Sequence, residues 1–451
     1  MKKLPEEFCL RMKNLLGAEY SDFIEALNYE PVRGFRVNTD KISVEEFEKI
    51  SDFSTDKIPY VKNGYYFKYD KIGNHPYHHA GMIYVQEPAA MAPAECIEID
   101  PEWCVLDMCA APGGKSTQIK NKLGENGILV SNEIIPSRCK ILTGNIERLG
   151  LKNCITTCMD TGRLARIYPD TFDLIMVDAP CSGEGMFRKD DTAIDEWSFE
   201  NVVKCAARQA EILENAAIML KNGGYIIYAT CTCSLEENEI TVDEFLQKHP
   251  EFEIVKVKEE VEKATSDGIS FEGCKCENIH FARRFYPHKG RGEGQFMAVL
   301  HNKNTGNEAE STPTKAKKPD KCVFDFLDDV LTEYNPAAVK LYNNTPVYFE
   351  PDFEVTGATV FSYGITIGEL KKNYIQPHHQ LFMALGGLFK RKIDLLPDSE
   401  QLKKYLHGEE IPADCGNGWA VVTVNGCAVG GAKVVTGTAK NHYPNGLRIK
   451  C

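Results

Sequence analysis

One stretch of the sequence decides the fold: Val105-Leu106-Asp107-Met108, followed by Cys109-Ala110-Ala111-Pro112-Gly113-Gly114-Lys115-Ser116. The first part is a short apolar run typical of a buried strand, and Ser116 to Leu123 has the pattern of a helix that stops at Gly124. A glycine-rich turn between strand and helix presents backbone N–H groups, which favour anionic groups and allow a ligand to approach closely. The stretch therefore predicts a nucleotide-type site in an α/β fold.

Strands and helices alternate on both sides of this turn, from about residue 85 to 302. Further strands are expected at Gly127–Asn132, Cys154–Thr157, Asp173–Asp178 and Gly224–Thr230, with one helix through Ile141 and an amphipathic helix over 200–220. This alternation predicts a mostly parallel sheet with helices on both faces. Such sheets bind their ligands at the carboxyl ends of the strands.

Two kinds of nucleotide site compete for the turn. A phosphate-binding loop needs a glycine where this chain has Cys109, although Asp178 imitates the acidic strand that holds magnesium in NTPases. S-adenosyl-L-methionine is favoured by two carboxylates at later strand ends. Glu133 can accept hydrogen bonds from ribose hydroxyls, and Asp160 can meet an adenine amino group. An NTPase stays open as the alternative.

Two cysteines follow the fourth and fifth strands of this series. Cys181 lies in Asp178-Ala179-Pro180-Cys181-Ser182-Gly183, and Cys231 lies in Thr230-Cys231-Thr232. Both stand past the apolar strand ends, beside the expected cofactor. C5 of cytosine accepts a methyl group only after a thiolate has added to C6, and Asp178 could stabilise the charge that develops at N3. The residues alone do not rank the two cysteines.

Three ordered motifs resemble those of the Nol/Nop/Sun family of RNA 5-methylcytosine methyltransferases: the turn at 109–115, the Asp178 to Gly183 segment and Thr230-Cys231-Thr232. The resemblance covers roughly residues 30 to 302 and includes Arg36-Val37-Asn38 and Gln86-Glu87-Pro88. It implies a Rossmann-like methyltransferase domain, with Cys231 as the nucleophile and Cys181 aiding release. It also implies these cofactor contacts: Cys109, Ala110, Ala111, Pro112, Gly113, Gly114, Lys115, Glu133, Asp160 and Asp178.

The C-terminal extension resembles that of the bacterial group of this family that acts on small-subunit ribosomal RNA, whose last module is similar to PUA-type RNA-binding domains. The implied partner is 16S rRNA in the 30S subunit, with tRNA as an alternative substrate and non-catalytic RNA binding as an alternative function. Glycine-punctuated apolar runs around Asn425-Gly426, a good hairpin signal, predict a β-rich module there.

The expected organisation has five parts. A small α+β RNA-binding region (1–84) precedes the methyltransferase domain (85–302), and a polar linker follows over 303–320. An intermediate domain (321–390) then leads to the PUA-like RNA-binding module (391–451).

Composition limits the setting in which the chain works. No apolar run approaches the length of a membrane span, no secretory signal is evident, and 17 cysteines in a large chain suit a reducing interior. We therefore expect a cytoplasmic protein, without membrane contact and monomeric. The formal net charge of -13 disfavours nucleic acid unless positive charge is local.

Local positive charge occurs in several basic clusters beside aromatic residues. Phe187-Arg188-Lys189 and Arg283-Arg284-Phe285-Tyr286-Pro287 are candidates for RNA contact, and ordinary packed surface is the competing interpretation for each. The clusters also include Arg33, His288, Lys289 and Arg291.

No metal is expected. Cys231 and Cys233 with Cys274 and Cys276 imitate a zinc site, but their pairs have one intervening residue and a metal would consume the nucleophile. The histidines at 75, 78 and 79 are expected in a surface loop.

Overall fold

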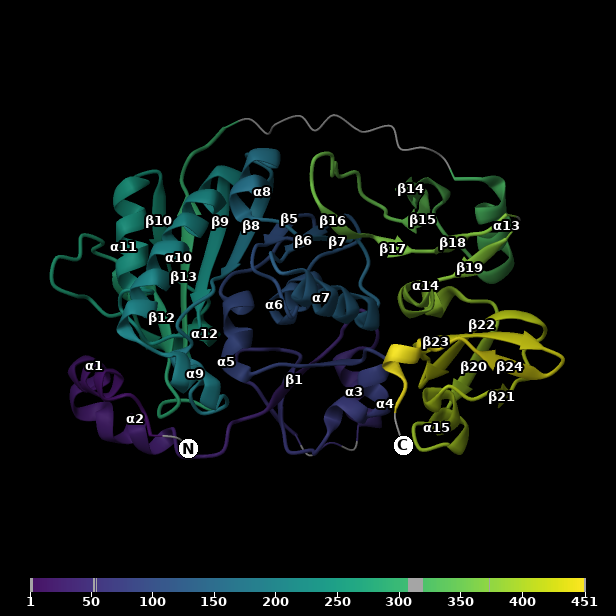
Figure 1. Ribbon diagram of the computed structural model, residues 1–451, viewed down its shortest axis with the longest axis horizontal. Coiled ribbons are helices and arrows are strands. Elements are labelled where there is room, and N and C mark those ends of the chain that lie inside the picture. The colour runs from purple at the N-terminus through teal and green to yellow at the C-terminus, as the bar shows by residue number, and fades with distance from the viewer. Residues whose placement is uncertain (1–2, 52, 54, 307–318, 373, 450–451) are drawn as a thin grey trace.

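A ten-stranded sheet forms the centre of the structure (Figure 1). The computed structural model describes residues 3–51, 53, 55–306, 319–372 and 374–449, so most of the expected linker lies outside the described residues. The strand order is β11-β12-β13-β9-β8-β5-β6-β7-β16, and β10 pairs with β13. The parallel strands are β5 Cys104–Asp107, β6 Ile128–Asn132, β7 Cys154–Thr157, β8 Phe172–Asp178 and β9 Leu220–Thr230.

The remaining strands of this sheet run antiparallel to their neighbours. They are β10 Phe252–Val255, β11 Ser266–Asp267, β12 Arg283–Phe285, β13 Gln295–Asn302 and β16 Val360–Tyr363. Helices cover both faces of the sheet, because its strands are apolar on both sides. The helices are α5 Pro88–Met91, α6 Gly114–Lys120, α7 Pro136–Leu149, α8 Thr161–Ile167, α9 Asp191–Glu196, α10 Phe199–Met219, α11 Glu239–Lys248 and α12 Glu259–Lys263.

Two apolar cores lie against the sheet. One contains side chains of α8, α10 and α11, and the other contains side chains of α5, α6, α7 and α12. The expected α/β fold class, with helices on both faces of the sheet, is thereby confirmed. The sheet itself is mixed and not mostly parallel, because β10, β11, β12, β13 and β16 add antiparallel pairings to the five parallel strands. Helix α7 continues past Ile141 to Leu149 and ends at Gly150, whose φ of 68° lies in the left-handed region.

The N-terminal region has its own small antiparallel sheet, in the order β2-β3-β1-β4. Its elements are α1 Glu6–Leu16, α2 Tyr20–Ala26, β1 Gly34–Val37, α3 Val44–Ile50, β2 Thr55–Lys57, β3 Gly64–Phe67, α4 Pro76–His79 and β4 Ile83–Val85. Helices α1 and α2 pack through Phe8 and Phe23 on Phe187 and Trp197, which follow the Cys181 loop. The N-terminal region therefore packs against the loop that follows β8 of the ten-stranded sheet.

The C-terminal part begins with α13 Lys321–Val330 and several short strands. They are β14 Val339–Tyr342, β15 Thr345–Tyr348, β17 Ile365–Thr366, β18 Gly368–Leu370 and β19 Ile375–Pro377, and α14 His379–Leu385 follows. A five-stranded sheet comes last, formed by β20 Lys392–Leu395, β21 Ile411–Pro412, β22 Gly418–Val424, β23 Cys427–Val435 and β24 Thr438–Asn441. Helix α15 Glu400–His407 lies between β20 and β21 in the sequence. The predicted Asn425-Gly426 turn joins β22 to β23, with positive φ at both residues.

Strand β16 was not predicted, and it joins the C-terminal part to the ten-stranded sheet (Figure 1). It pairs antiparallel with β7, so that Tyr363 lies opposite Ile155. Val347 and Phe349 from the same part are buried in one core with β7 and β8. The ten-stranded sheet is therefore completed by β16, which begins at Val360, 130 positions beyond the end of the last predicted strand at Thr230.

The N-terminal and C-terminal parts also contact each other. Lys41 Nζ donates to the Met383 carbonyl at 2.5 Å, and His79 Nδ1 lies 2.8 Å from the Tyr443 hydroxyl. The prediction that the three histidines lie in a surface loop is wrong, because His78 and His79 belong to α4 and are half-buried. Burial lowers the pKa of His78 to about 3 and that of His79 to about 4. None of the described helices has both the length and the apolar character needed to cross a membrane.

Candidate active site

The glycine-rich turn connects β5 to α6 at the carboxyl edge of the sheet. Gly113 has a φ of +112°, which side chains rarely adopt, and a Cβ on Gly114 would come within 3.3 Å of the Gln86 side chain. Ser116 Oγ donates to Asp107 Oδ2 at 2.6 Å, whereas Asp107 Oδ1 is buried without a hydrogen-bond partner among the described residues. Burial raises the pKa of Asp107 to about 7.

A buried arginine from the N-terminal region supports the turn. Arg36 is 1% exposed, and it donates to Gln86 Oε1 at 2.8 Å, to the Gly114 carbonyl at 2.9 Å and to Thr117 Oγ1 at 2.8 Å. Burial lowers the pKa of Arg36 to about 10, so the guanidinium stays charged at neutral pH. Arg36 and Gln86 thus hold the start of α6 in place.

Glu133 and Asp160 lie at the ends of the next two parallel strands. Glu133 is 3% exposed and pairs with Arg138 at 3.2 Å, and Arg138 also donates to the Ala111 carbonyl of the turn. Asp160 is exposed and caps α8, since its Oδ1 accepts the backbone N–H groups of Gly162 and Arg163. The structure links Glu133 to the turn, whereas the Asp160 side chain accepts hydrogen bonds within its own helix cap.

An ion pair crosses the centre of the site. Lys115 Nζ lies 2.7 Å from Asp178 Oδ2, joining the turn to the end of β8. Burial by itself would lower the pKa of Lys115, but the Asp178 carboxylate outweighs it, and the net effect is a raised pKa. Lys115 therefore remains a cation beside the two cysteines.

Cys181 and Cys231 lie side by side. Their Sγ atoms are 3.1 Å apart, and both residues follow neighbouring strands, β8 and β9. The hydrogen bond to Cys231 and then burial raise the pKa of Cys181 well above its ordinary value. Cys181 is therefore a neutral thiol at neutral pH.

Two buried carboxylates, Glu184 and Glu237, hold the cysteine loops together, and we call them the carboxylate clasp. Glu184 belongs to the Cys181 loop, but its Oε2 accepts the backbone N–H of Cys233 and the hydroxyl of Thr232, both at 3.0 Å. Glu237 follows the Cys231 loop, but it accepts the backbone N–H of Ser182 at 2.9 Å and the Ser182 hydroxyl. Each loop thus supplies the hydrogen-bond acceptor for the other.

Further contacts complete the clasp. The Ser182 and Thr232 hydroxyls lie 3.0 Å apart, Gln209 donates to Glu237, and Trp197 Nε1 donates to Glu184 at 3.0 Å. Glu237 is fully buried and Glu184 is 4% exposed, and burial raises the pKa of both carboxyls. All four oxygens of the two carboxylates accept hydrogen bonds, and buried carboxylates satisfied in this way fix a single arrangement of the groups around them.

The structure contradicts most of the two basic clusters proposed for RNA contact, because among their residues only Lys189 is exposed, and it lines a cavity. Arg188 pairs with Glu293 at 3.0 Å, and Arg284 is buried in an ion pair with Glu239 while donating to the Cys233 carbonyl. Phe187, Phe285 and Tyr286 are each at most 3% exposed. The competing interpretation, packed side chains, is correct here, because carboxylates distant in sequence bind these arginines inside the protein.

Sequence reasoning missed the clasp and the unpartnered oxygen of Asp107. The only signal was the acidic run Glu236-Glu237-Asn238-Glu239 directly after the Cys231 loop. Cys233 is buried beside the clasp, with a pKa raised by burial to about 12. Among the described residues, no group of three or more His, Cys, Asp or Glu side chains could hold a metal ion.

Comparison with known proteins identifies three regions of the chain. The description "16S rRNA methyltransferase RsmB/F" matches residues 94–301, "N-terminal domain of 16S rRNA methyltransferase RsmF" matches 4–88, and "Methyltransferase RsmF PUA domain" matches 392–449. Among solved structures, a methyltransferase homolog protein from Pyrococcus horikoshii is 28% identical, with a TM-score of 0.58 over 66% of this chain and 95% of that one. NSun6 from the same organism, 23% identical with a TM-score of 0.56 over 67% of this chain and 99% of that one, shares the fold.

Full-length relatives agree with these regions. Ribosomal RNA small subunit methyltransferase F of Vibrio vulnificus (strain YJ016) is 32% identical over 98% of this chain and 97% of its own length. The protein of the same name from Shewanella sp. (strain MR-4) is 30% identical over 99% and 98%. These matches confirm the methyltransferase domain, the bacterial group and the PUA module expected from the sequence. The chain belongs to the ribosomal RNA small subunit methyltransferase F family.

Proposed function

We propose that the chain methylates C5 of a cytosine in 16S rRNA within the 30S subunit, through a covalent bond between Cys231 and C6 of the base. RNA methylation with S-adenosyl-L-methionine is the activity of the family, and the proposal concerns the target atom and the residues. It rests chiefly on one observation: two thiols 3.1 Å apart lie at the same sheet edge as the glycine-rich turn and Asp178.

The carboxyl edge of the sheet fits S-adenosyl-L-methionine. The turn from Cys109 to Lys115 allows close approach at its glycines, Asp107 has an unpartnered buried oxygen, and Glu133, Asp160 and Asp178 are carboxylates at neighbouring strand ends. We assign the cofactor contacts to the turn and to these last three carboxylates. When bound, the cofactor supplies an electrophilic methyl group.

The chain's own residues would carry out the rest of the reaction. The Cys231 thiolate adds to C6, which makes C5 nucleophilic, while Asp178, acting as an acid, donates a proton or hydrogen bond to N3, where the negative charge develops. After C5 has accepted the methyl group, its proton passes to solvent water. The electron pair of the C5–H bond then forms the C5–C6 double bond as the bond between C6 and Sγ breaks, which regenerates the aromatic base and returns Cys231 as a thiolate. Cys181, 3.1 Å from Cys231, is placed to aid this release.

The assignment of Cys231 as the nucleophile rests on the resemblance of Thr230-Cys231-Thr232 to the family motif, because either Sγ atom of the pair could donate its proton to the other. Lys115 stands beside the pair as a buried cation, and the charge of a Cys231 thiolate contributes to raising the Lys115 pKa.

A trapped adduct tests this mechanism. Cys181→Ala should accumulate a covalent RNA–protein complex that survives denaturing electrophoresis, whereas Cys231→Ala should form none and transfer no methyl group. Cys233→Ala is the matched control, because this third cysteine is buried beside the clasp and should behave as wild type. An adduct that persists in Cys231→Ala but is absent in Cys181→Ala would reverse the two roles.

Assays on the same purified protein distinguish the proposed reaction from the alternative substrate and from the alternative classes of function. Radiolabel from S-adenosyl-L-methionine should enter C5 of cytosine in 30S subunits. Label entering only tRNA would favour the tRNA alternative, ATP hydrolysis without transfer would favour an NTPase, and binding of subunits without transfer would indicate a non-catalytic RNA-binding protein.

A further inference from the structure

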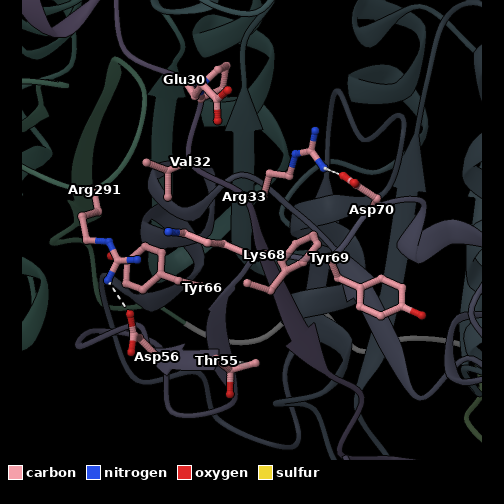
Figure 2. Close-up of a pocket in the computed structure, with 12 residues that line it drawn as sticks. Glu30, Val32, Arg33, Thr55, Asp56, Tyr66, Lys68, Tyr69, Asp70 and Arg291 are labelled. Carbon is pink, nitrogen blue, oxygen red and sulfur yellow. Dashed lines mark hydrogen bonds and ion pairs between the residues drawn. The ribbon is translucent and has the colours of Figure 1, made fainter. Parts of the chain in front are cut away.

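A groove lies between the N-terminal region and the catalytic domain (Figure 2). It has a volume of about 950 Å³, and β3, the segment before β1 and Arg291 of the catalytic domain line it. A second cavity of about 290 Å³ shares Pro31, Val32 and Arg33 with it. The two cavities therefore adjoin each other.

The second cavity is lined by residues that lie close to the cofactor turn and just after the Cys181 loop. It is lined by Gln86, which contacts Gly114 of the cofactor turn, and by Lys189, which follows the Cys181 loop. Ala89, which lies two residues after Glu87, packs against Gly292. Gly294, two residues further along that segment, lies close to the Cys233 side chain. A chain lying in the groove would therefore run from the N-terminal sheet toward the two cysteines.

The groove carries cations that can exchange their partners. Arg33 pairs with Asp70 at 3.7 Å and Arg291 with Asp56 at 3.0 Å, and all four side chains are more than half exposed. Such exposed pairs contribute about 0–1 kcal/mol, so phosphate oxygens can replace these carboxylates at little cost. The exposed Lys68 has no ion-pair partner among the described residues, and Figure 2 shows it between the two arginines.

Aromatic rings flank these cations. The Arg291 guanidinium lies 3.8 Å from the centre of the Tyr66 ring, an arrangement visible in Figure 2. Tyr69 is 40% exposed at the other end of the groove. The rings of Phe53 and His75 pack edge-on against its ring, with centroid separations of 5.2 and 5.6 Å. Cations that follow a backbone together with a fixed, accessible ring are the combination that binds unpaired nucleic acid.

We propose that this groove holds the unpaired RNA strand next to the target cytosine, with Arg33, Lys68 and Arg291 on phosphates and Tyr69 stacked on a base. The inference rests on the proposed function and goes beyond it, because it places the substrate on one surface. An unpaired strand is required since a base inside a helix hides C5 and C6.

The test measures binding of a short, unpaired, cytidine-containing oligoribonucleotide to the full-length protein by fluorescence anisotropy over a range of salt. Lys68→Ala and Arg33→Ala should each raise Kd several-fold and make the slope of log K against log salt shallower by about 0.7. Tyr69→Ala should raise Kd about tenfold, and Tyr69→Phe should not, because it keeps the ring. Asp70→Asn should lower Kd, because it frees Arg33.

Matched controls make the result decisive. Lys204→Ala removes an exposed lysine of α10 that pairs only with Glu200, and it should leave Kd and the salt slope unchanged. Each variant should bind S-adenosyl-L-methionine as wild type does, which shows that it is folded. Groove variants that bind RNA as wild type does would overturn the inference, as would a crosslinker at position 68 that labels a protein of the 30S subunit instead of RNA.

The outcomes also separate this inference from the proposed function. If wild-type protein methylates cytosine but the groove variants keep wild-type Kd, only the groove is wrong. If wild-type protein binds RNA through the groove but adds no methyl group at C5, only the proposed reaction is wrong.

Discussion

Glu184 and Glu237 bring the two cysteine loops into a fixed relation, although neither carboxylate needs to touch the RNA. Each accepts a backbone N–H from the loop that carries the other cysteine. Because both carboxylates are buried, losing one acceptor leaves donors without partners in a region that water does not reach. The 3.1 Å separation of the Sγ atoms therefore depends on side chains outside the reacting set.

Glu237→Gln should lower kcat and leave binding of S-adenosyl-L-methionine unchanged. An amide has one acceptor atom where the carboxylate uses two for Ser182 and Gln209, so the Cys181 loop should move. Losing one such buried contact costs about 1–3 kcal/mol, which corresponds to about 5- to 160-fold in kcat if it acts on the transition state. Single-turnover methyl transfer with isothermal titration of the cofactor measures both quantities.

The control for this change is Glu236→Gln, at the adjacent and more exposed carboxylate that pairs with Arg11. It should have little effect on kcat. Equal losses in the two variants would show that the clasp does not position the thiols.

Sequence reasoning predicted where Cys181, Cys231 and Asp178 lie, because strand ends of a parallel sheet meet at one edge. It could not predict the clasp, since an acidic run ordinarily indicates a solvated surface. The partners that make its burial tolerable, Ser182 and Gln209, lie about 30 to 55 positions away along the chain. The same physics misled the prediction for Arg284, whose partner Glu239 is 45 positions away.

At the scale of elements, the N-terminal sheet supports the cofactor turn through Arg36 at the end of β1. We expect Arg36→Lys to raise the Kd for S-adenosyl-L-methionine about tenfold. An ammonium on a flexible stem cannot reproduce the planar set of bonds to Gln86, Gly114 and Thr117. Arg33→Lys, three residues earlier and exposed, is the control. Calorimetric titration of both variants decides, and unchanged cofactor affinity in Arg36→Lys would rule out a supporting role.

Most elements of the catalytic domain could be predicted, because each has its own pattern of apolar residues and its own turn. All five parallel strands lie within a few residues of their expected bounds. Strand β16 could not be predicted, since its four residues form a strand only by pairing with β7, about 200 positions earlier. Local pattern carries no information on such a distant partner.

At the scale of the whole molecule, Lys41 joins the N-terminal region to α14 and β23. Burial lowers its pKa to about 8, below the value of 10.5 for an exposed lysine. Between these two values the unfolded chain holds a proton that the folded protein has released, so the Lys41 contribution to stability rises with pH. Its slope is at most about 1.4 kcal/mol per pH unit.

The melting temperature of wild type minus that of Lys41→Met should therefore increase as the pH rises from 8 toward 10. The difference between the two proteins cancels the titration of groups that they share. Parallel curves for the two proteins would mean that Lys41 is not buried at this junction.

The late pairing of β16 with β7 affects the order in which the protein can fold while it is being synthesised. When β7 leaves the ribosome, its outer edge has no partner, and about 200 further residues (157 to 360) must be added before β16 exists. At about 5–20 residues per second this takes roughly 10–40 s. During that interval an open strand edge of a half-made enzyme is free to pair with another nascent chain. Production of active protein should consequently depend on translation speed between these two strands.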